Sequence, residues 1–256
     1  PPPSPHLPLV ARNAGRSICG MRNLVRGVLA LLFALLPTAC ANLNFYTDDE
    51  LEPLSVQAYD EASKEHAAIT SGAQYQMVQR VAQKIAAAAE EPNFKWQARL
   101  LKADDVVNAF CLPNGRIAVY TGLLKVADDE AQLAVVMGHE VAHATRRHGG
   151  KRMTQSSITQ GAMSAIGAGL GMTQMTPETK DTVMGVLGMG ANVGVLLPFS
   201  REHESEADVE GLRYAIRAGY DPEAAPKLWD KMAKLGGSSG PAWMSTHPAS
   251  ADRAAK

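Results

Sequence analysis

Residues 129–150 of this 256-residue chain read DEAQLAVVMGHEVAHATRRHGG and predict the central helix of the fold. Asp129 can cap a helix by accepting hydrogen bonds from the backbone of the first turn, and Gln132 completes a capping box three residues later. Mostly apolar residues follow, and Gly149-Gly150 is typical of a helix end. The stretch therefore predicts an apolar helix that begins after Asp129 and ends at the two glycines.

This helix carries His139-Glu140-Val141-Ala142-His143, the pattern H-E-x-x-H. With 3.6 residues per turn, His139 and His143 lie on one helix face and can offer two nitrogens to one Zn²⁺. Glu140 then lies beside the metal rather than on it, where it can take a proton from the attacking water and pass it to the leaving amine. The pattern predicts a zinc site in which Glu140 is the general base.

A tetrahedral zinc with one open position needs a third protein ligand. Residues 200–208, SREHESEAD, supply a polar cluster about sixty residues after the motif. Glu204 and Asp208 are four residues apart on one helix face, so one can bind zinc while the other accepts a hydrogen bond from a ligand histidine. The alternative to a role at the metal is that polar residues simply face solvent at the start of a charged helix. We expect this of Glu202, His203 and Glu206.

Residue periodicity predicts the elements around this helix. Helical spacing runs from about 56 to 90, strands are expected at 94–101, 106–111 and 116–120, and further helices at 202–218 and 222–235. Two apolar stretches rich in glycine and methionine, 158–175 and 183–199, are expected to be core-facing helices. A membrane-embedded hairpin is the alternative, which the frequent glycines disfavour because such a hairpin would be richer in Leu and Ile.

Composition narrows the class of protein. The chain is 46% hydrophobic and 20% charged, a balance typical of a globular protein with one substantial core, so one catalytic domain is expected. The formal net charge is −1 and there is no long basic run. Nucleic-acid binding is therefore excluded, because nothing supplies the surface that neutralises phosphates.

The N-terminal part of the chain resembles an export signal. Residues 1–20 lack Met and are rich in Pro, which suggests an upstream extension. Residues 21–40 combine basic Arg22 and Arg26 with an apolar run at 27–36 and small residues after it, the order found in a signal peptide. The apolar run is ten residues long, whereas a membrane-spanning helix needs roughly 20. We therefore expect an exported protein.

The processing site allows two outcomes. Leu36-Pro37-Thr38-Ala39-Cys40 resembles a bacterial lipobox, although Pro37 departs from the pattern. A lipidated Cys40 would anchor the protein, on the periplasmic side, to the bacterial outer membrane. Ala39-Cys40-Ala41 also satisfies the A-x-A rule, which would give a soluble periplasmic or secreted protein. We favour the lipoprotein, although Cys40 and Cys111 could otherwise form a disulfide. Residues 41–55 are then a tether and residues 56–256 the zinc metallopeptidase domain.

Together the motifs resemble one family. H-E-x-x-H followed by Ser200-Arg201-x-x-Glu204-x-Glu206-Ala207-Asp208 is similar to the gluzincin metallopeptidases that include HtpX and the CAAX prenyl protease type 1 enzymes, especially their small periplasmic lipoprotein members. Further similar segments are NAF at 108–110, PNG at 113–115, TGLL at 121–124, STHP at 245–248 and Arg253, so that the resemblance covers about residues 56–253.

The resemblance implies an α+β fold, a mainly helical zincin-type domain with a small β-sheet whose edge strand borders the active site. It implies one zinc per chain, with Glu204 as the third ligand and Asp208 and Arg201 supporting the ligands. Asn108, Ala109 and Phe110 would form the edge strand that takes up substrate.

The function implied is a zinc-dependent endopeptidase that degrades unfolded or misassembled envelope proteins, taken in extended form along the edge strand. One alternative is a zinc-containing periplasmic holdase or assembly factor for outer-membrane proteins with little proteolysis; another is a zinc hydrolase with a non-protein substrate. His247 follows a Gly/Ser-rich segment at 236–240. It is either a surface side chain, a gate that occupies the fourth zinc position, or a catalytic donor to the oxyanion.

Overall fold

The computed structural model describes residues 43–169, 199–235 and 242–247. The predicted upstream extension, the signal peptide and Cys40 lie outside the described residues. So does all of the second apolar stretch except Phe199, and the first stretch is described only as far as Gly169.

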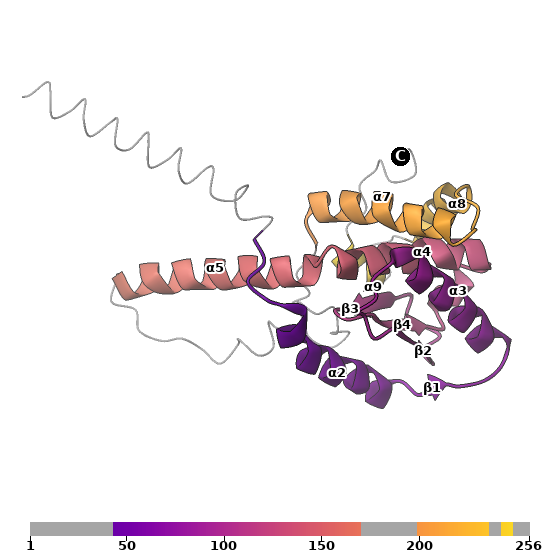
Figure 1. The fold of residues 1–256 in the computed structure, drawn as a ribbon, viewed down its shortest axis with the longest axis horizontal. Coiled ribbons are helices and arrows are strands. Elements are labelled where there is room, and N and C mark those ends of the chain that lie inside the picture. Colours follow the sequence, from indigo (N-terminus) through magenta and orange to yellow (C-terminus); the bar gives the residue numbers. More distant parts are fainter. Residues whose placement is uncertain (1–42, 170–198, 236–241, 248–256) are drawn as a thin grey trace, which may run out of the picture. The chain divides into compact units, whose positions relative to one another are not determined.

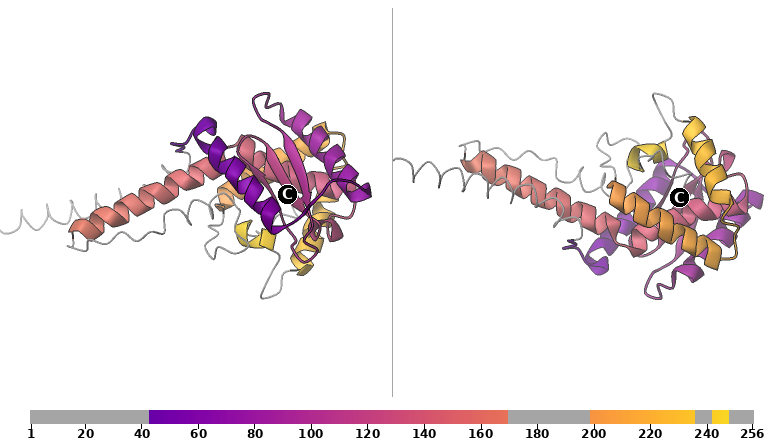
Figure 2. Two further views of the ribbon diagram at one scale, coloured as in Figure 1. Left: turned by 90° about the horizontal axis from the view of Figure 1, so that it is seen from below. Right: turned by 90° about the horizontal axis from the view of Figure 1, so that it is seen from above.

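Helices surround a small mixed sheet, which confirms the predicted α+β class (Figure 1). In chain order the elements are α2 (Asp48–Glu65), β1 (Ala68–Ile69), α3 (Ala73–Ala89), β2 (Gln97–Leu101), β3 (Ala109–Leu112), β4 (Arg116–Tyr120), the 3-10 helix η1 (Leu123–Lys125), α4 (Glu130–Thr145), α5 (His148–Gly169), α7 (Arg201–Arg217), α8 (Ala224–Leu235) and α9 (Ala242–Thr246). Seen from below and from above in Figure 2, α2 and α7 lie on opposite sides of the domain.

The sheet has the strand order β1-β2-β4-β3, with β2 and β4 parallel and the other neighbours antiparallel. The predicted turn at 113–115 joins β3 to β4, and Asn114 (φ 68°) and Gly115 (φ 85°) both adopt the left-handed region, which Asn and Gly tolerate best. Among the described residues β3 is an edge strand, as predicted for residues 108–110.

Helix α4 forms the centre of the core. Asp129 caps it by accepting a hydrogen bond from the backbone N–H of Gln132, as predicted, and every residue from Gln132 to Thr145 is buried. Helix α7 packs directly along it, because Gly138 and Gly211 face each other and a Cβ on either would collide with the other helix's backbone. This close approach brings the first turn of α7 over the H-E-x-x-H face.

Several predicted boundaries differ from the structure, and the largest differences concern two helical segments. The central helix ends at Thr145 rather than at Gly149-Gly150, because Arg147 adopts a left-handed conformation (φ 55°) and a new helix begins at His148. The helical layer expected from 56 to 90 is two helices, separated by β1 and Gly72 (φ 95°).

The predicted tether at 41–55 is helical from Asp48 onward. Thr47 and Glu50 form a capping box at the start of α2, and Leu51 is buried in the core. Arg116 of β4 holds Glu52 through a bidentate ion pair with a shortest distance of 2.8 Å. The folded unit therefore begins before Val56, because the buried Leu51 and the Glu52–Arg116 ion pair hold this segment against the sheet.

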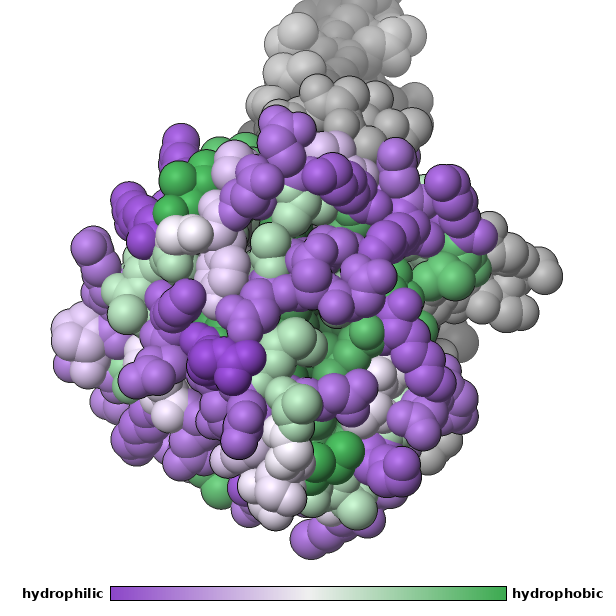
Figure 3. All heavy atoms as spheres, turned by 90° about the vertical axis from the view of Figure 1, so that its right-hand side faces the viewer, coloured by the Kyte–Doolittle hydropathy of each residue, from purple (hydrophilic) through white to green (hydrophobic). Residues whose placement is uncertain are grey.

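On the face drawn in Figure 3, hydrophilic side chains predominate and apolar ones form small groups between them. Within the described ranges, no helix is both long enough and apolar enough to cross a membrane.

Candidate metal centre

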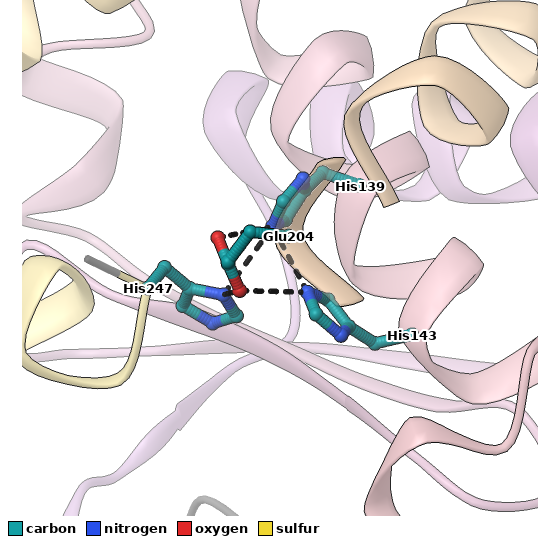
Figure 4. A group of neighbouring side chains, drawn as sticks. All are labelled: His139, His143, Glu204 and His247. Carbon is teal, nitrogen blue, oxygen red and sulfur yellow. Dashed lines mark hydrogen bonds and ion pairs between the residues drawn. The ribbon is translucent and has the colours of Figure 1, made fainter. Parts of the chain in front are cut away.

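Four buried side chains converge on one point between α4, α7 and the end of α9 (Figure 4). His139 and His143 come from α4, Glu204 from α7, and His247 from the residue after α9. One ligand atom from each lies within 4.8 Å of all the others. Nε2 of His139 is 3.0 Å from Nε2 of His143, and Nδ1 of His247 is 2.9 Å from Oε1 of Glu204. The structure thus brings together all three predicted ligands and His247.

The chemistry of these atoms fits a metal ion. Asp208 can only accept, so Nδ1 of His139, 2.9 Å from its Oδ1, carries the proton and Nε2 presents a lone pair to the cluster. Nε2 of His143 and Oε1 of Glu204, 3.3 Å apart, face the same point. Ligand atoms ~2.0–2.1 Å from one tetrahedral ion are about 3.3 Å apart, so a cation held between these atoms matches their spacing.

Burial and hydrogen bonding set the charges of the ligands. Burial lowers the pKa of His143 well below its usual value, which keeps the imidazole in the neutral form that binds metals. Burial alone would raise the pKa of Glu204, but hydrogen bonds with His139, His143 and His247 outweigh it and hold this pKa far below its usual range. Glu204 is therefore a carboxylate, as a metal ligand must be.

Of the two residues expected to support the ligands, only one contacts them. Asp208 holds the ring of His139 through the 2.9 Å hydrogen bond. Arg201 is exposed at the first position of α7 and makes no polar contact with the other described residues. Its side chain points to solvent because the inward face of this turn is taken by His203 and Glu204, which are buried.

Glu140 lies beside the cluster, as expected for a base that is not a ligand. Its Oε1 is 3.5 Å from Nε2 of His247 and accepts a 2.7 Å hydrogen bond from the indole N–H of Trp243. Trp243 is 1% exposed and stacks on His247, with ring centroids 4.6 Å apart. The sequence pattern did not point to Trp243, because its contact with Glu140 depends on the packing of α9.

A cavity of about 40 Å³ connects the cluster to the edge of the sheet. It is lined by Asn108, Ala109 and Phe110 of the predicted edge segment together with Glu140, His143 and His247. The backbone N–H of Trp243 donates a 3.2 Å hydrogen bond to the carbonyl of Val107, just before β3. The edge segment therefore borders the site, as predicted, and α9 covers its beginning.

No sequence motif singled out His148, and the environment expected for its neighbour His203 was wrong, whereas Glu206 is exposed as expected. Nδ1 of His148 lies 3.0 Å from Nδ1 of His143, and its Nε2 lies 3.1 Å from Oε2 of Glu206. His203, expected on a solvated helix start, is instead buried and stacks on His148 with ring centroids 4.3 Å apart. These contacts could not be read from spacing, since they arise where the chain turns back after Thr145.

Sequence comparisons identify a family and several relatives. The sequence profile of Peptidase family M48 matches residues 73–256. Mitochondrial metalloendopeptidase OMA1 of Arabidopsis thaliana is 38% identical over 168 residues, 66% of this chain and 32% of the relative. The protein of that name from Schizosaccharomyces pombe is 33% identical over 181 residues, 70% of this chain and 50% of the relative.

A bacterial relative is also similar. The beta-barrel assembly-enhancing protease of Escherichia coli is 31% identical over 156 residues, 57% of this chain and 30% of the relative. The chain thus spans between 30% and 50% of the lengths of these three relatives. The profile match covers most of the chain, and the chain therefore belongs to peptidase family M48, which confirms the metallopeptidase family that its motifs predicted.

Proposed function

We propose that the protein is a zinc-dependent endopeptidase that cleaves unfolded or misassembled proteins of the bacterial envelope. One observation carries the proposal: Glu140, the ligand His143 and the edge segment at 108–110 line the same cavity. A base, a metal ligand and a backbone edge that can hold an extended peptide are what hydrolysis of a peptide bond requires. The names of the relatives, endopeptidases and a protease, support this class.

The residues divide the work as follows. A bound zinc would polarise the scissile carbonyl and lower the pKa of the attacking water. Glu140 accepts the proton of that water and delivers it to the leaving amine. Asp208 keeps Nδ1 of His139 protonated, so that Nε2 stays available as a ligand.

Substrate would join the sheet as an additional strand beside β3. An edge strand offers backbone N–H and C=O groups to an extended peptide, and main-chain hydrogen bonds supply most of the affinity in such complexes. Because strand addition binds the substrate through its backbone, selectivity for particular substrate side chains should be low. Folded proteins would be poor substrates, since their strands are already paired.

With α9 packed over the site, as in this structure, the enzyme would be inactive. His247 lies at the fourth position of the cluster, with its Nδ1 2.9 Å from Oε1 of Glu204. Trp243 donates hydrogen bonds to Oε1 of Glu140 and to the backbone carbonyl of Val107. A cavity of about 40 Å³ has room for little more than a water molecule, so a peptide would have to displace α9. We propose His247 as a gate; donation to the oxyanion after displacement is the alternative.

The cleavage proposal is tested with the zinc-loaded protein and an outer-membrane protein presented unfolded or folded. The expected result is cleavage of the unfolded form alone, lost on chelation and restored by zinc. Suppressed aggregation without any cleavage would instead support a holdase.

We further propose that the protein is an outer-membrane lipoprotein anchored through Cys40. The signal-like order of residues 21–40 supports export, and one relative is named for β-barrel assembly while others are named as mitochondrial. Cys40→Ser, expressed with its own leader, should turn a membrane-bound protein into a soluble periplasmic one, because a bacterial lipoprotein is held by several acyl chains. Wild-type protein already soluble after cell breakage would instead support cleavage after Ala41.

A further inference from the structure

We propose that His148 and Glu206 are positioning residues, which together fix the ring of His143 for metal binding; this rests on the proposed metal centre. His148 is the first residue of α5 and is fully buried. Its two ring nitrogens contact different partners, Nδ1 of His143 at 3.0 Å and Oε2 of Glu206 at 3.1 Å. The three side chains form a continuous line from the metal site to the surface.

The carboxylate sets the direction of every hydrogen bond in this line. Glu206 as a carboxylate can only accept, so Nε2 of His148 carries a proton and donates it. In a neutral imidazole the other nitrogen is then an acceptor, and Nδ1 of His148 accepts from Nδ1–H of His143. That leaves the lone pair of His143 on Nε2, the nitrogen that faces Glu204 and His139.

The two histidine ligands are thus oriented by two different arrangements. Asp208 accepts directly from His139 at 2.9 Å, because residues 204 and 208 share one face of α7. Glu206 is two residues from Glu204, roughly 200° around the helix, and cannot face the metal site. A relay through His148 is what lets a carboxylate on that side of α7 act on His143.

The break between α4 and α5 brings His148 next to His143. Had α4 continued, His148 would stand five residues after His143, roughly 140° around the helix axis, and would point away from it. Arg147, with a φ of 55°, ends the helix and turns the chain, so that His148 returns to the ring of His143. The left-handed conformation of Arg147 is unusual, because residues other than glycine rarely adopt it.

The test measures zinc affinity by competition with a chelator, independently of peptide cleavage. His148→Phe keeps a flat ring that can stack on His203 but has no nitrogen, and should weaken zinc binding 10- to 100-fold. His148→Gln offers an amide oxygen to His143 and an amide N–H to Glu206, and should restore affinity to within about threefold of wild type. Glu202→Gln, an exposed carboxylate on the same helix, is the matched control and should leave the affinity unchanged.

A second readout separates positioning from mere packing. Long-range ¹⁵N–¹H NMR of the zinc-loaded protein should show a slowly exchanging proton on Nδ1 of His143, lost in His148→Phe and retained in Glu202→Gln. If His148→Phe does not fold, Glu206→Ala decides: its zinc affinity should fall about 10-fold.

Unchanged affinity in His148→Phe or Glu206→Ala overturns the relay, and so does an equal loss in His148→Phe and His148→Gln. A wild-type protein that binds no zinc would overturn the proposed function itself. The two failures are therefore distinguishable.

Discussion

The indole N–H of Trp243 donates a 2.7 Å hydrogen bond to Oε1 of Glu140, so a short helix near the C-terminus holds the general-base candidate of α4. The same helix ends beside His247, whose Nδ1 is 2.9 Å from Glu204. One segment therefore contacts both the base and a predicted metal ligand, which links access to the site with the position of α9.

Glu140→Gln should abolish cleavage of an unfolded protein and leave about one zinc per chain. The substitution removes the group that accepts the proton of the attacking water and keeps the three ligands. Cleavage is followed by gel electrophoresis and zinc by atomic absorption. Loss of the metal in this variant would point to a structural role for Glu140.

Glu204→Ala should lower zinc affinity by 10- to 100-fold or more, because it removes a carboxylate at the centre of the cluster. Chelator competition measures the change, and Glu202→Gln again serves as the control. Zinc binding equal to that of the wild type would transfer the ligand role to another carboxylate of α7.

His247→Ala separates the two roles proposed for this side chain by sign. Removal of a gate should raise the cleavage rate of an unfolded protein, whereas removal of an oxyanion donor should lower kcat by about 10²-fold. Trp243→Phe keeps an aromatic ring and removes the N–H donor to Glu140, so a latch formed by α9 predicts a faster rate here too. If both variants keep the wild-type rate and zinc affinity, α9 has neither function.

Glu52→Gln should destabilise the fold near neutral pH by about 1.5–3 kcal/mol, the range for hydrogen bonds to charged groups. Hydrogen bonds from Arg116 lower the pKa of Glu52 to about 2, against an ordinary value of 4.5. Because the pKa of Glu52 is lower in the folded state than in the unfolded state, its ionised carboxylate stabilises the fold fully above pH 4.5. This stabilisation is lost as the pH falls towards 2. The difference between wild type and variant, measured by urea unfolding, should therefore shrink between pH 5 and pH 2. A constant difference across this range would contradict the ion pair.

Local chemistry was enough to predict much of the fold from the sequence. The cap at Asp129, the turn at Asn114-Gly115 and the helix from Arg201 depend on residues within a few positions of one another. The pairing of His139 with His143 follows from 3.6 residues per turn. The family resemblance added Glu204 and the edge strand, and the structure places both at the cluster.

The tertiary structure alone decided how these ligands are supported. His148 reaches His143 only because the chain reverses at Arg147, and Trp243 reaches Glu140 only through the packing of α9. Arg201, expected near the ligands, faces solvent for the same kind of reason, since its direction depends on how α7 packs on α4. Residues close in sequence are joined by fixed backbone geometry, whereas contacts between distant segments depend on the packing of the whole domain, which local spacing does not encode.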